Sequence, residues 1–327
     1  MVRFATIGTS MITENFLQAA EECRGFCLKG VYSRNMDKAR AFGDKYHAEK
    51  FYDSLDILAA DPEIDAVYIA SPNYMHCRHA IRFLQAKKHV LCEKALGSNS
   101  REAEQMFHTA KENQVLLLEA MRPLFDPGFQ AVRENIARLG KIRRADFHYG
   151  KYSSKYDGFK AGEHQNIFDR NCSAGALMDM GVYCVHPMAA LFGMPESIKA
   201  ESVMLPGEID GAGTILAKYD GIIAQLTYTK ITNTFTPSEI QGEEGVMVIS
   251  DIASPREISI RYNDGTVENI PVVSCKNNMV YEIGRFIQAV EEGHTMEENK
   301  IVSIIAMKVM DEARRQCGIC FPADEQI

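Results

Sequence analysis

Short apolar runs alternate with amphipathic stretches through the first 120 residues of the chain. The apolar runs, which we expect to be strands, are 3–8, 26–33, 65–71, 89–94 and 114–120. The stretches between them carry apolar residues at helical spacing and are 12–23, 35–47, 74–87 and 100–113. The predicted strands are almost continuously apolar, which is typical of strands covered by helices on both faces. The pattern therefore predicts right-handed crossovers and a doubly wound parallel sheet, a Rossmann arrangement.

Polar residues mark where two of these helices should begin. Asn73 precedes one of them, and Ser98 or Ser100 precedes the next. Side chains of these types accept hydrogen bonds from the first free amides of a helix. We therefore expect them to be helix caps.

After Glu119 the pattern changes to long alternating segments. A helix is predicted over 126–140 with Pro127 in its first turn, and further helices over 174–193, 279–292 and 299–317. Strand-like segments cover 141–152, 197–206, 212–219, 222–230, 237–250, 256–262 and 266–273. Turns at 220–221 and 263–265 are typical of hairpins. The prediction is an N-terminal Rossmann domain, 1–120, followed by a C-terminal α+β domain, 121–327, with a large open and mostly antiparallel sheet.

The composition of the chain argues against some classes of binding partner and favours one cellular compartment. The 327 residues are enough for two domains, and a net charge of −8 without a basic block argues against nucleic acid. We see no run of about 18 apolar residues to span a membrane and no secretory leader before the first strand. The nine cysteines lack metal-ligand spacing; the nearest approach is the CxxC pair at 317–320. We expect free thiols in the cytoplasm and no metal site.

The loop after the first predicted strand is the first candidate binding site. Residues 8–13, GTSMIT, match the dinucleotide fingerprint only in part, because Ser10 and Thr13 stand where glycine or a small residue is usual. Gly8 suits the tight turn, and Ser10 is small enough for a pyrophosphate to approach. The alternative is an ordinary turn between a strand and a helix. The predicted cofactor contacts in this loop are Gly8, Thr9, Ser10, Met11 and Ile12.

The second predicted strand ends in Ser33 and Arg34 rather than in an acidic residue. An NAD-binding fold usually carries Asp or Glu there to accept from the ribose 2′-hydroxyl, whereas a guanidinium binds a 2′-phosphate. We therefore predict NADP, with NAD still possible. The alternative is that Arg34 is only a solvated side chain before a helix.

Three further strand ends carry polar residues, at 71–73, 93–94 and 119–122. Ligands of doubly wound sheets bind beyond the carboxyl ends of the strands, so Lys94 should lie near the reacting groups. The alternative is that Glu93 and Lys94 form a surface ion pair.

The apolar stretch 173–193 carries Asp179 and Tyr183 at i and i+4, which places them on one face of a helix. A buried carboxylate needs a partner, and a lysine from the other domain would serve. Pro187 should kink this helix. His186 points elsewhere and is expected to be a core histidine.

Taken together, these motifs resemble the glucose–fructose oxidoreductase, inositol dehydrogenase and MocA group of NAD(P)-dependent oxidoreductases, in particular the branch with dimeric dihydrodiol dehydrogenase. The motifs that carry the resemblance are ASPNYMH (70–76), KKHVLCEK (87–94), EAMRPLF (119–125), 139–156, AGALMDMGVYCVH (174–186) and GICFPAD near the C-terminus. The resemblance implies a Rossmann domain followed by a domain with an open antiparallel sheet. The family's EKP motif falls on Glu93, Lys94 and Ala95, so Ala95 replaces a proline and should loosen the backbone there.

The resemblance also implies the site. Its catalytic residues would be Lys94, Asp179 and Tyr183, with tyrosine as in the dihydrodiol and glucose–fructose members. Its cofactor contacts, besides the glycine loop, would be Ser33, Arg34, Ser71, Pro72, Asn73, His76, Glu93, Lys94 and Arg122. The hypothesis is hydride transfer between nicotinamide and a carbinol or carbonyl carbon, with Tyr183 moving the proton. The ammonium of Lys94 would favour the phenolate of Tyr183, and Asp179 would orient Lys94 or bind a substrate hydroxyl.

The substrate class expected is a sugar, polyol or cyclic diol. Candidate lining residues are 151–156, Arg122, His164 and Asn166, although each alone suits a surface loop equally well. The alternatives are an inositol-type NAD-dependent dehydrogenase and a non-catalytic dinucleotide sensor. The open sheet should need cover, which predicts a homodimer or homotetramer through the C-terminal domain.

Overall fold

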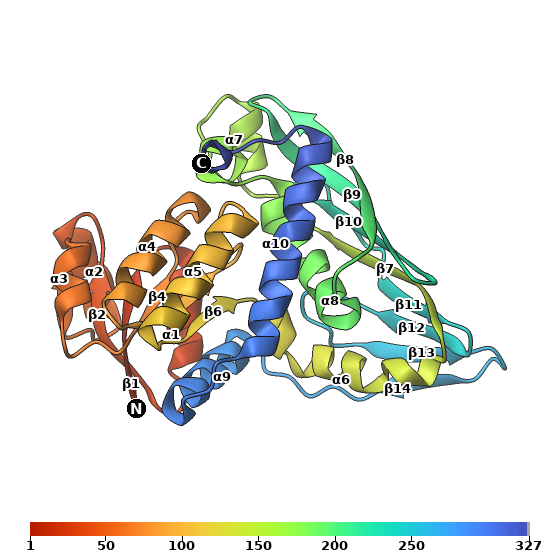
Figure 1. Cartoon of the computed structure of the whole chain (residues 1–327), viewed down its shortest axis with the longest axis horizontal. Helices are drawn as coiled ribbons and strands as arrows, with labels where there is room; N and C mark the ends of the chain where they lie inside the picture. Colours follow the sequence, from red (N-terminus) through yellow and green to blue (C-terminus); the bar gives the residue numbers. More distant parts are fainter. Residues whose placement is uncertain (326–327) are drawn as a thin grey trace. The chain divides into compact units, whose positions relative to one another are not determined.

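The computed structural model describes residues 1–325, and its contacts divide the chain into two compact units (Figure 1). The first unit contains Met1–Ala120 and Lys276–Ile304, and the second contains the described residues from Met121 to Cys275 and from Ile305 onward. The sequence analysis placed all of 121–327 in the second domain. In the structure, residues 276–304 return to the first unit.

The first unit is built on a parallel sheet with strand order β3-β2-β1-β4-β5-β6. The strands are β1 (Val2–Ile7), β2 (Phe26–Tyr32), β3 (Lys50–Tyr52), β4 (Ala66–Ile69), β5 (His89–Glu93) and β6 (Leu117–Ala120). This order, which reverses direction between β1 and β4, confirms the predicted doubly wound sheet. The sequence analysis missed β3 because three residues are too few to show periodicity.

Helices α1 (Met11–Ala20), α2 (Met36–Lys45), α4 (Asn73–Gln85) and α5 (Ser100–Asn113) follow the predicted positions, and a short α3 (Leu55–Ala60) was not predicted. Helices α4 and α5 pack side by side (Figure 1). The predicted caps were wrong. Asn73 is the first residue of α4, and α5 is capped by Asn99, whose Oδ1 accepts from the Glu102 amide at 3.0 Å. The Glu102 carboxylate also accepts a hydrogen bond from the Ser98 amide, so side chains satisfy backbone amides both before and within the first turn of α5.

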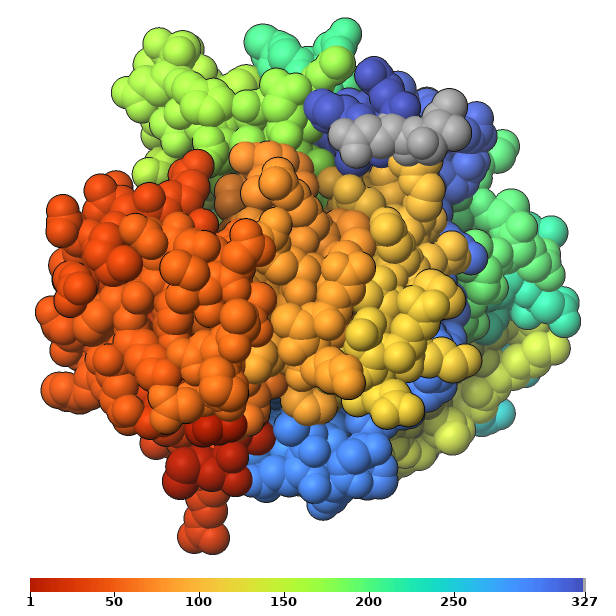
Figure 2. Space-filling model, turned by 60° about the vertical axis from the view of Figure 1, so that its left-hand side comes forward, coloured from red at the N-terminus to blue at the C-terminus, as the bar shows by residue number. Residues whose placement is uncertain are grey.

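Helix α9 (Met279–Glu292) joins the first unit by packing on α1 and β1. The rings of Phe286 and Phe4 lie 5.6 Å apart, and Glu291 pairs with the N-terminal ammonium at 2.6 Å. In Figure 2 this blue helix lies beside the red N-terminal residues. The sequence analysis could predict α9 from its period, but not its domain, because only tertiary contact assigns a helix to a core. Helix α10 (Glu297–Cys317) then crosses the division between the units.

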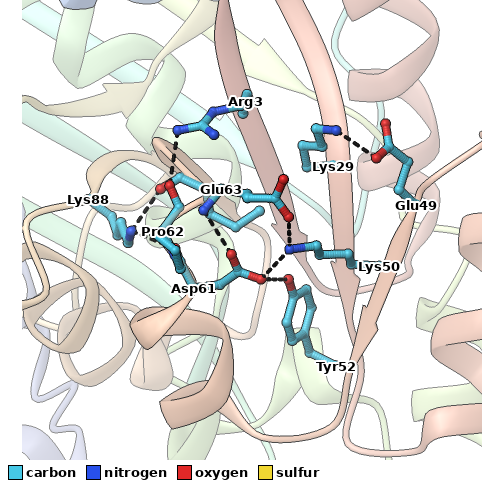
Figure 3. Close-up of polar contacts among 10 residues, drawn as sticks. Arg3, Lys29, Glu49, Lys50, Tyr52, Asp61, Pro62, Glu63 and Lys88 are labelled. Carbon is cyan, nitrogen blue, oxygen red and sulfur yellow. Dashed lines mark hydrogen bonds and ion pairs between the residues drawn. The ribbon is translucent and has the colours of Figure 1, made fainter.

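A cluster of charged residues holds the connection between α3 and β4 (Figure 3). The Asp61 carboxylate accepts from Lys50 at 2.8 Å and from the Tyr52 hydroxyl at 2.7 Å. The buried Lys88 ammonium donates to the carbonyls of Asp61 and Ile64 at 2.7 and 2.8 Å. These bonds fix the short edge strand β3 to the loop that precedes β4.

Asp61→Asn is expected to lower the free energy of unfolding by about 1 kcal/mol near neutral pH. Burial raises the pKa of Asp61, but hydrogen bonds from Lys50, the Glu63 amide and Tyr52 outweigh it and lower that pKa to about 2. Since the folded pKa lies below the unfolded value, this contribution is present above pH ~4 and is lost as the pH falls toward about 2. Urea unfolding at neutral pH and at the lowest pH where the wild type remains folded measures it.

The matched control is Glu49→Gln, which removes an exposed ion pair with Lys29. Exposed pairs contribute little, so this variant should unfold like the wild type. A deficit in Asp61→Asn that does not shrink on acidification would contradict the assignment.

The second unit is built on an eight-stranded sheet with strand order β14-β13-β12-β11-β7-β10-β9-β8. The strands are β7 (Ile142–Gly150), β8 (Ser197–Leu205), β9 (Ile209–Tyr219), β10 (Ile222–Thr229), β11 (Ser238–Gly242), β12 (Gly245–Ile249), β13 (Ile258–Tyr262) and β14 (Val267–Ile270). Every pair is antiparallel except β10 with β7. The mostly antiparallel sheet was predicted.

The segment 237–250, predicted as one strand, is in fact the hairpin β11–β12. Glu243 and Glu244 form its turn, and their amides donate to the carbonyls of Lys141 and Leu139. A Cβ at Gly242 would lie 2.1 Å from the Leu139 carbonyl oxygen, so this turn depends on glycine. The glycines on either side of the two glutamates were the signal that the sequence analysis overlooked.

The helices of the second unit are α6 (Pro127–Asn135), α7 (Tyr156–Lys160) and α8 (Val182–Phe192). Asp126 caps α6, a short 3₁₀ turn at Ile136–Leu139 ends it, and α7 was not predicted. The predicted helix 174–193 begins as a π-helical turn, Leu177–Gly181, before α8, which packs on β7 and β10. By length and composition Arg170–Phe192 could cross a membrane, but 72% of its apolar window is buried within the structure. That burial is typical of the core helix of a globular domain.

Candidate active site

A cavity of about 600 Å³ opens in the first unit at the carboxyl ends of β1, β2 and β4. Its lining includes seven of the predicted cofactor contacts, namely Gly8, Thr9, Ser10, Ser33, Arg34, Ser71 and Pro72. Other predicted contacts of this unit, Met11, Ile12, Asn73, His76, Glu93 and Lys94, do not line it. Three strands that the sequence places far apart thus contribute to one cavity.

The turn at Gly8 shows why glycine is needed there. Its φ is +116°, and a Cβ would lie 2.9 Å from the carbonyl oxygen of Ala70. Ser10 caps α1 through its backbone while its side chain makes no capping bond, so the hydroxyl is left at the cavity. Thr13, which replaces the third glycine of the fingerprint, is fully buried between helix and sheet. The loop therefore fits a pyrophosphate at the N-terminus of α1.

The electrostatics of this cavity are dominated by arginines. Arg34 follows β2, while Arg78 and Arg82 lie one helical turn apart on α4. Arg82 pairs with Asp56, the one acidic residue in the lining, whereas Arg34 and Arg78 form no ion pair with any described residue. The excess of guanidinium suits a phosphate. The sequence analysis missed Arg78 and Arg82, although their i and i+4 spacing after a strand end was a usable signal.

His79 also lines the cavity, and its Nδ1 lies 3.1 Å from the Ser71 hydroxyl. Burial and the neighbouring cationic side chains lower the pKa of His79 to about 4. The ring is therefore neutral at physiological pH and adds no charge to the cavity.

Glu93 is the last residue of β5 and Lys94 follows it, and the structure shows which groups hydrogen-bond to the Glu93 carboxylate. Its Oε1 accepts from the Tyr68 hydroxyl at 2.5 Å, and burial, followed by the charge of Glu93, raises the pKa of that tyrosine. The Lys94 amide donates to Glu93 Oε2 at 3.3 Å. Glu93 thus anchors the end of the strand directly before Lys94.

The backbone after Lys94 is held by buried polar groups. The Lys94–Ala95 peptide bond is cis. The His76 ring lies with Nδ1 2.9 Å from the Ala95 oxygen and Nε2 2.7 Å from the Ser71 oxygen. The amide of Leu96 donates to the buried Glu119 at 3.0 Å. The loosening expected from Ala95 is opposed by these contacts, and His76 is placed to support the loop rather than to line the cavity.

Asp179 and Tyr183 lie in the second unit, on the π-helical turn and on α8. Tyr183 is buried, its ring 4.8 Å from that of Tyr149, and the Arg122 guanidinium lies 5.8 Å from its centroid. The wider π-helical turn means that α-helical spacing does not describe the path from Asp179 to Tyr183. His186 is fully buried with Nδ1 3.1 Å from the Val182 oxygen, which confirms the predicted core histidine.

Asp179 has a partner that the sequence analysis did not predict. The Lys230 ammonium lies 3.1 Å from Asp179 Oδ2 and belongs to the same unit. Of the other candidate lining residues, His164 lines a cavity of about 440 Å³ and pairs with Asp169 at 3.7 Å. Asn166 and residues 151–156 do not line that cavity.

A cavity of this kind, beyond a glycine turn at the carboxyl edge of a doubly wound sheet, defines the first unit as a dinucleotide-binding domain. Residues 2–121 match the model of an oxidoreductase family with an NAD-binding Rossmann fold, and residues 129–248 match the GFO/IDH/MocA C-terminal domain. The chain therefore belongs to the GFO/IDH/MocA family and is an oxidoreductase.

Two curated relatives and one solved structure illustrate the family. The chain is 43% identical to the scyllo-inositol 2-dehydrogenase (NADP(+)) IolU of Bacillus subtilis, covering 99% of this chain and all of the relative. It is 28% identical to the trans-1,2-dihydrobenzene-1,2-diol dehydrogenase of Mus musculus over 90% of each chain. A 3-ketoreductase from Actinomadura kijaniata, solved with NADP and TDP-benzene, is 24% identical with a TM-score of 0.86, covering 97% and 98% of the two chains. This last likeness shows the fold.

Proposed function

We propose that the protein is an NADP-dependent dehydrogenase that oxidises one carbinol carbon of a cyclic polyol to a ketone, and reduces the ketone in reverse. The observation that carries the proposal is the cavity in the first unit, with its glycine turn and its arginine-rich end. The substrate class rests on the full-length relative named for scyllo-inositol and on the relative named for a cyclic diol.

The residues of the cavity suit NADP rather than NAD. No acidic residue ends β2, and Arg34, which follows that strand and lines the cavity, carries the guanidinium that suits a 2′-phosphate. The relative that names scyllo-inositol also names NADP(+). The inositol-type alternative and the preference for NADP, which the sequence analysis treated as separate readings, are thus combined in one proposal.

The side chains of the protein would bind the substrate and transfer the proton. When bound, NADP supplies the hydride acceptor at C4 of its nicotinamide. During oxidation Tyr183 takes the proton of the substrate hydroxyl, and during reduction it returns that proton to the oxygen. We propose Lys94 as the electrostatic partner of Tyr183 in this proton transfer, and Asp179 as the group that orients the substrate hydroxyl or Lys94. These three roles, and the cofactor contacts predicted at Met11, Ile12, Asn73, Glu93 and Arg122, are part of the proposal.

A substrate panel tests the proposal directly. The purified protein is assayed with NADP⁺ and with NAD⁺ against inositol isomers, aldoses, open-chain polyols and cyclic diols, following absorbance of the reduced cofactor. We expect the highest kcat/KM for a cyclic polyol with NADP⁺. Higher kcat/KM with NAD⁺ would favour the NAD-dependent alternative. No turnover with any member would count against the assigned substrate class.

We also propose that two or more copies pair through the open sheet of the second unit. Leu216 on β9 and Ile223 on β10 are 44% and 55% exposed, and the register places them on the same face. Val203 on β8 adds a further exposed apolar side chain, 55% exposed. A second copy of the same sheet would cover this apolar strip.

Replacing Ile223 by lysine is expected to lower the solution mass to that of one chain, because a charge would be buried in the interface. Light scattering after size exclusion measures the mass. Ile301→Lys, at an equally exposed position in the first unit, is the control and should leave the assembly intact. A wild-type protein with the mass of one chain would overturn this part of the proposal.

The cytoplasm is the compartment that we propose. All nine cysteines lie within the described residues and are thiols rather than disulfides, as suits a reducing environment.

A further inference from the structure

Lys230 is a lysine with no solvent exposure, placed directly after β10. Its ammonium donates to the Ile167 carbonyl oxygen at 2.7 Å and lies 3.1 Å from Asp179 Oδ2. It also lies 4.6 Å from the centroid of the Phe168 ring. One ammonium therefore joins β10, the 3₁₀ turn at Asn166–Phe168 and the π-helical turn that carries Asp179.

Burying an ammonium costs free energy unless it is paired with an opposite charge or hydrogen-bond acceptors. We therefore expect the buried Lys230 to be needed either for stability or for the reaction. A second carboxylate stands close by. Burial raises the pKa of Asp210 to about 6, while the charge of Lys230 acts to lower it. Asp210 Oδ2 accepts from the Leu177 amide at 2.7 Å, at the start of the same π-helical turn. The turn is thus held at its first residue by Asp210 and at Asp179 by Lys230.

We propose that Lys230 is a positioning residue for the reaction, acting through Asp179. This inference rests on the proposed function, in which Asp179 faces the substrate. The Asp179 side chain is 30% exposed, so one side of the carboxylate is covered by the unit and part of it remains open to a ligand. The ammonium fixes the orientation of that carboxylate, because it is itself held in place by the Ile167 carbonyl and lies 3.1 Å from Asp179 Oδ2.

The role makes a specific kinetic prediction. Without the ammonium, the contact that holds Asp179 Oδ2 is lost, and the carboxylate can shift from the orientation that the reaction needs. We expect kcat to fall by about 100-fold, the usual effect of misplacing a group at the reacting centre. The Kd for NADPH should not change, because Lys230 is not among the residues that line the proposed cofactor cavity.

The variants are Lys230→Met, which keeps a long stem without charge, and Lys230→Gln, which keeps a donor for the Ile167 carbonyl. If Lys230→Met does not fold, Lys230→Gln is measured in its place. The matched control is Lys88→Met. Lys88 is also a buried lysine with two carbonyl partners, but it belongs to the structural cluster beside Asp61. The control should lose thermal stability while kcat stays within about 2-fold of the wild type.

A double-mutant cycle separates positioning from stability. We expect the Lys230 variant to lower kcat strongly in the wild-type background and by less than about 2-fold in an Asp179→Asn background. An equal loss in both backgrounds, or a lower Tm with unchanged kcat, would overturn the role of Lys230 and leave the proposed function standing. Full activity of Asp179→Asn alone would overturn the assignment of Asp179 and, with it, this role for Lys230.

Discussion

Replacing Tyr183 by phenylalanine is expected to lower kcat by about 10²- to 10⁴-fold, the usual contribution of a positioned general acid or base. The substitution removes only the hydroxyl. The ring contacts with Tyr149 and Arg122 depend on the aromatic face and should persist. NADPH binding, measured by fluorescence titration, should therefore be unchanged while turnover is lost.

The control is Tyr219→Phe, another buried tyrosine of the second unit, whose hydroxyl donates to the Gly193 carbonyl at 3.1 Å. Loss of that bond should reduce stability and leave kcat nearly intact. Lys94→Met should behave like Tyr183→Phe, with turnover lost and cofactor binding retained. Wild-type kcat in both Lys94→Met and Tyr183→Phe would rule out the assigned proton transfer.

Replacing Arg34 by alanine is expected to raise the Kd for NADPH by about 10- to 100-fold, the range for losing hydrogen bonds to a charged group. The Kd for NADH should hardly change, because NADH has no 2′-phosphate. Isothermal titration of both cofactors against wild type and variant measures the ratio.

The matched control for this experiment is Arg40→Ala on α2. Its guanidinium lies 5.3 Å from the Phe51 centroid and does not line the cavity. It should alter neither affinity. If Arg34→Ala weakens NADPH and NADH to the same extent, Arg34 contacts a part common to both cofactors and the proposed basis for NADP preference fails.

Part of the lining of the first-unit cavity was predictable, since seven of the predicted cofactor contacts line it. The turn at Gly8 and the polar residues at the ends of β2 and β4 come directly after strands. The alternation of apolar and amphipathic segments predicts those strands and their place in one parallel sheet. The failed prediction for the cap of α5 reflects competition between neighbouring polar side chains. Asn99 lies between the two serines that were predicted as caps. Its Oδ1 accepts the hydrogen bond from the Glu102 amide and so caps α5 in their place.

The partners of the second unit's residues were not predictable in the same way. Asp179 was expected to need a lysine, and the structure supplies Lys230, which lies 51 positions further along the chain. A lone lysine at the end of an apolar strand has the same sequence signature whether it is buried or solvated. Its burial is decided by the packing of the turn at Ile167 and Phe168 over it.

The sequence by itself determined the kinds of element, the parallel and antiparallel classes of the two sheets, and the glycine turn that admits a dinucleotide, because these follow from periodicity and backbone sterics within a few residues. Tertiary structure alone decided that α9 packs on β1 and that a buried ammonium holds Asp179. Each of these joins residues far apart in the chain. The free energy that selects them comes from burial and charge compensation, which no local pattern records.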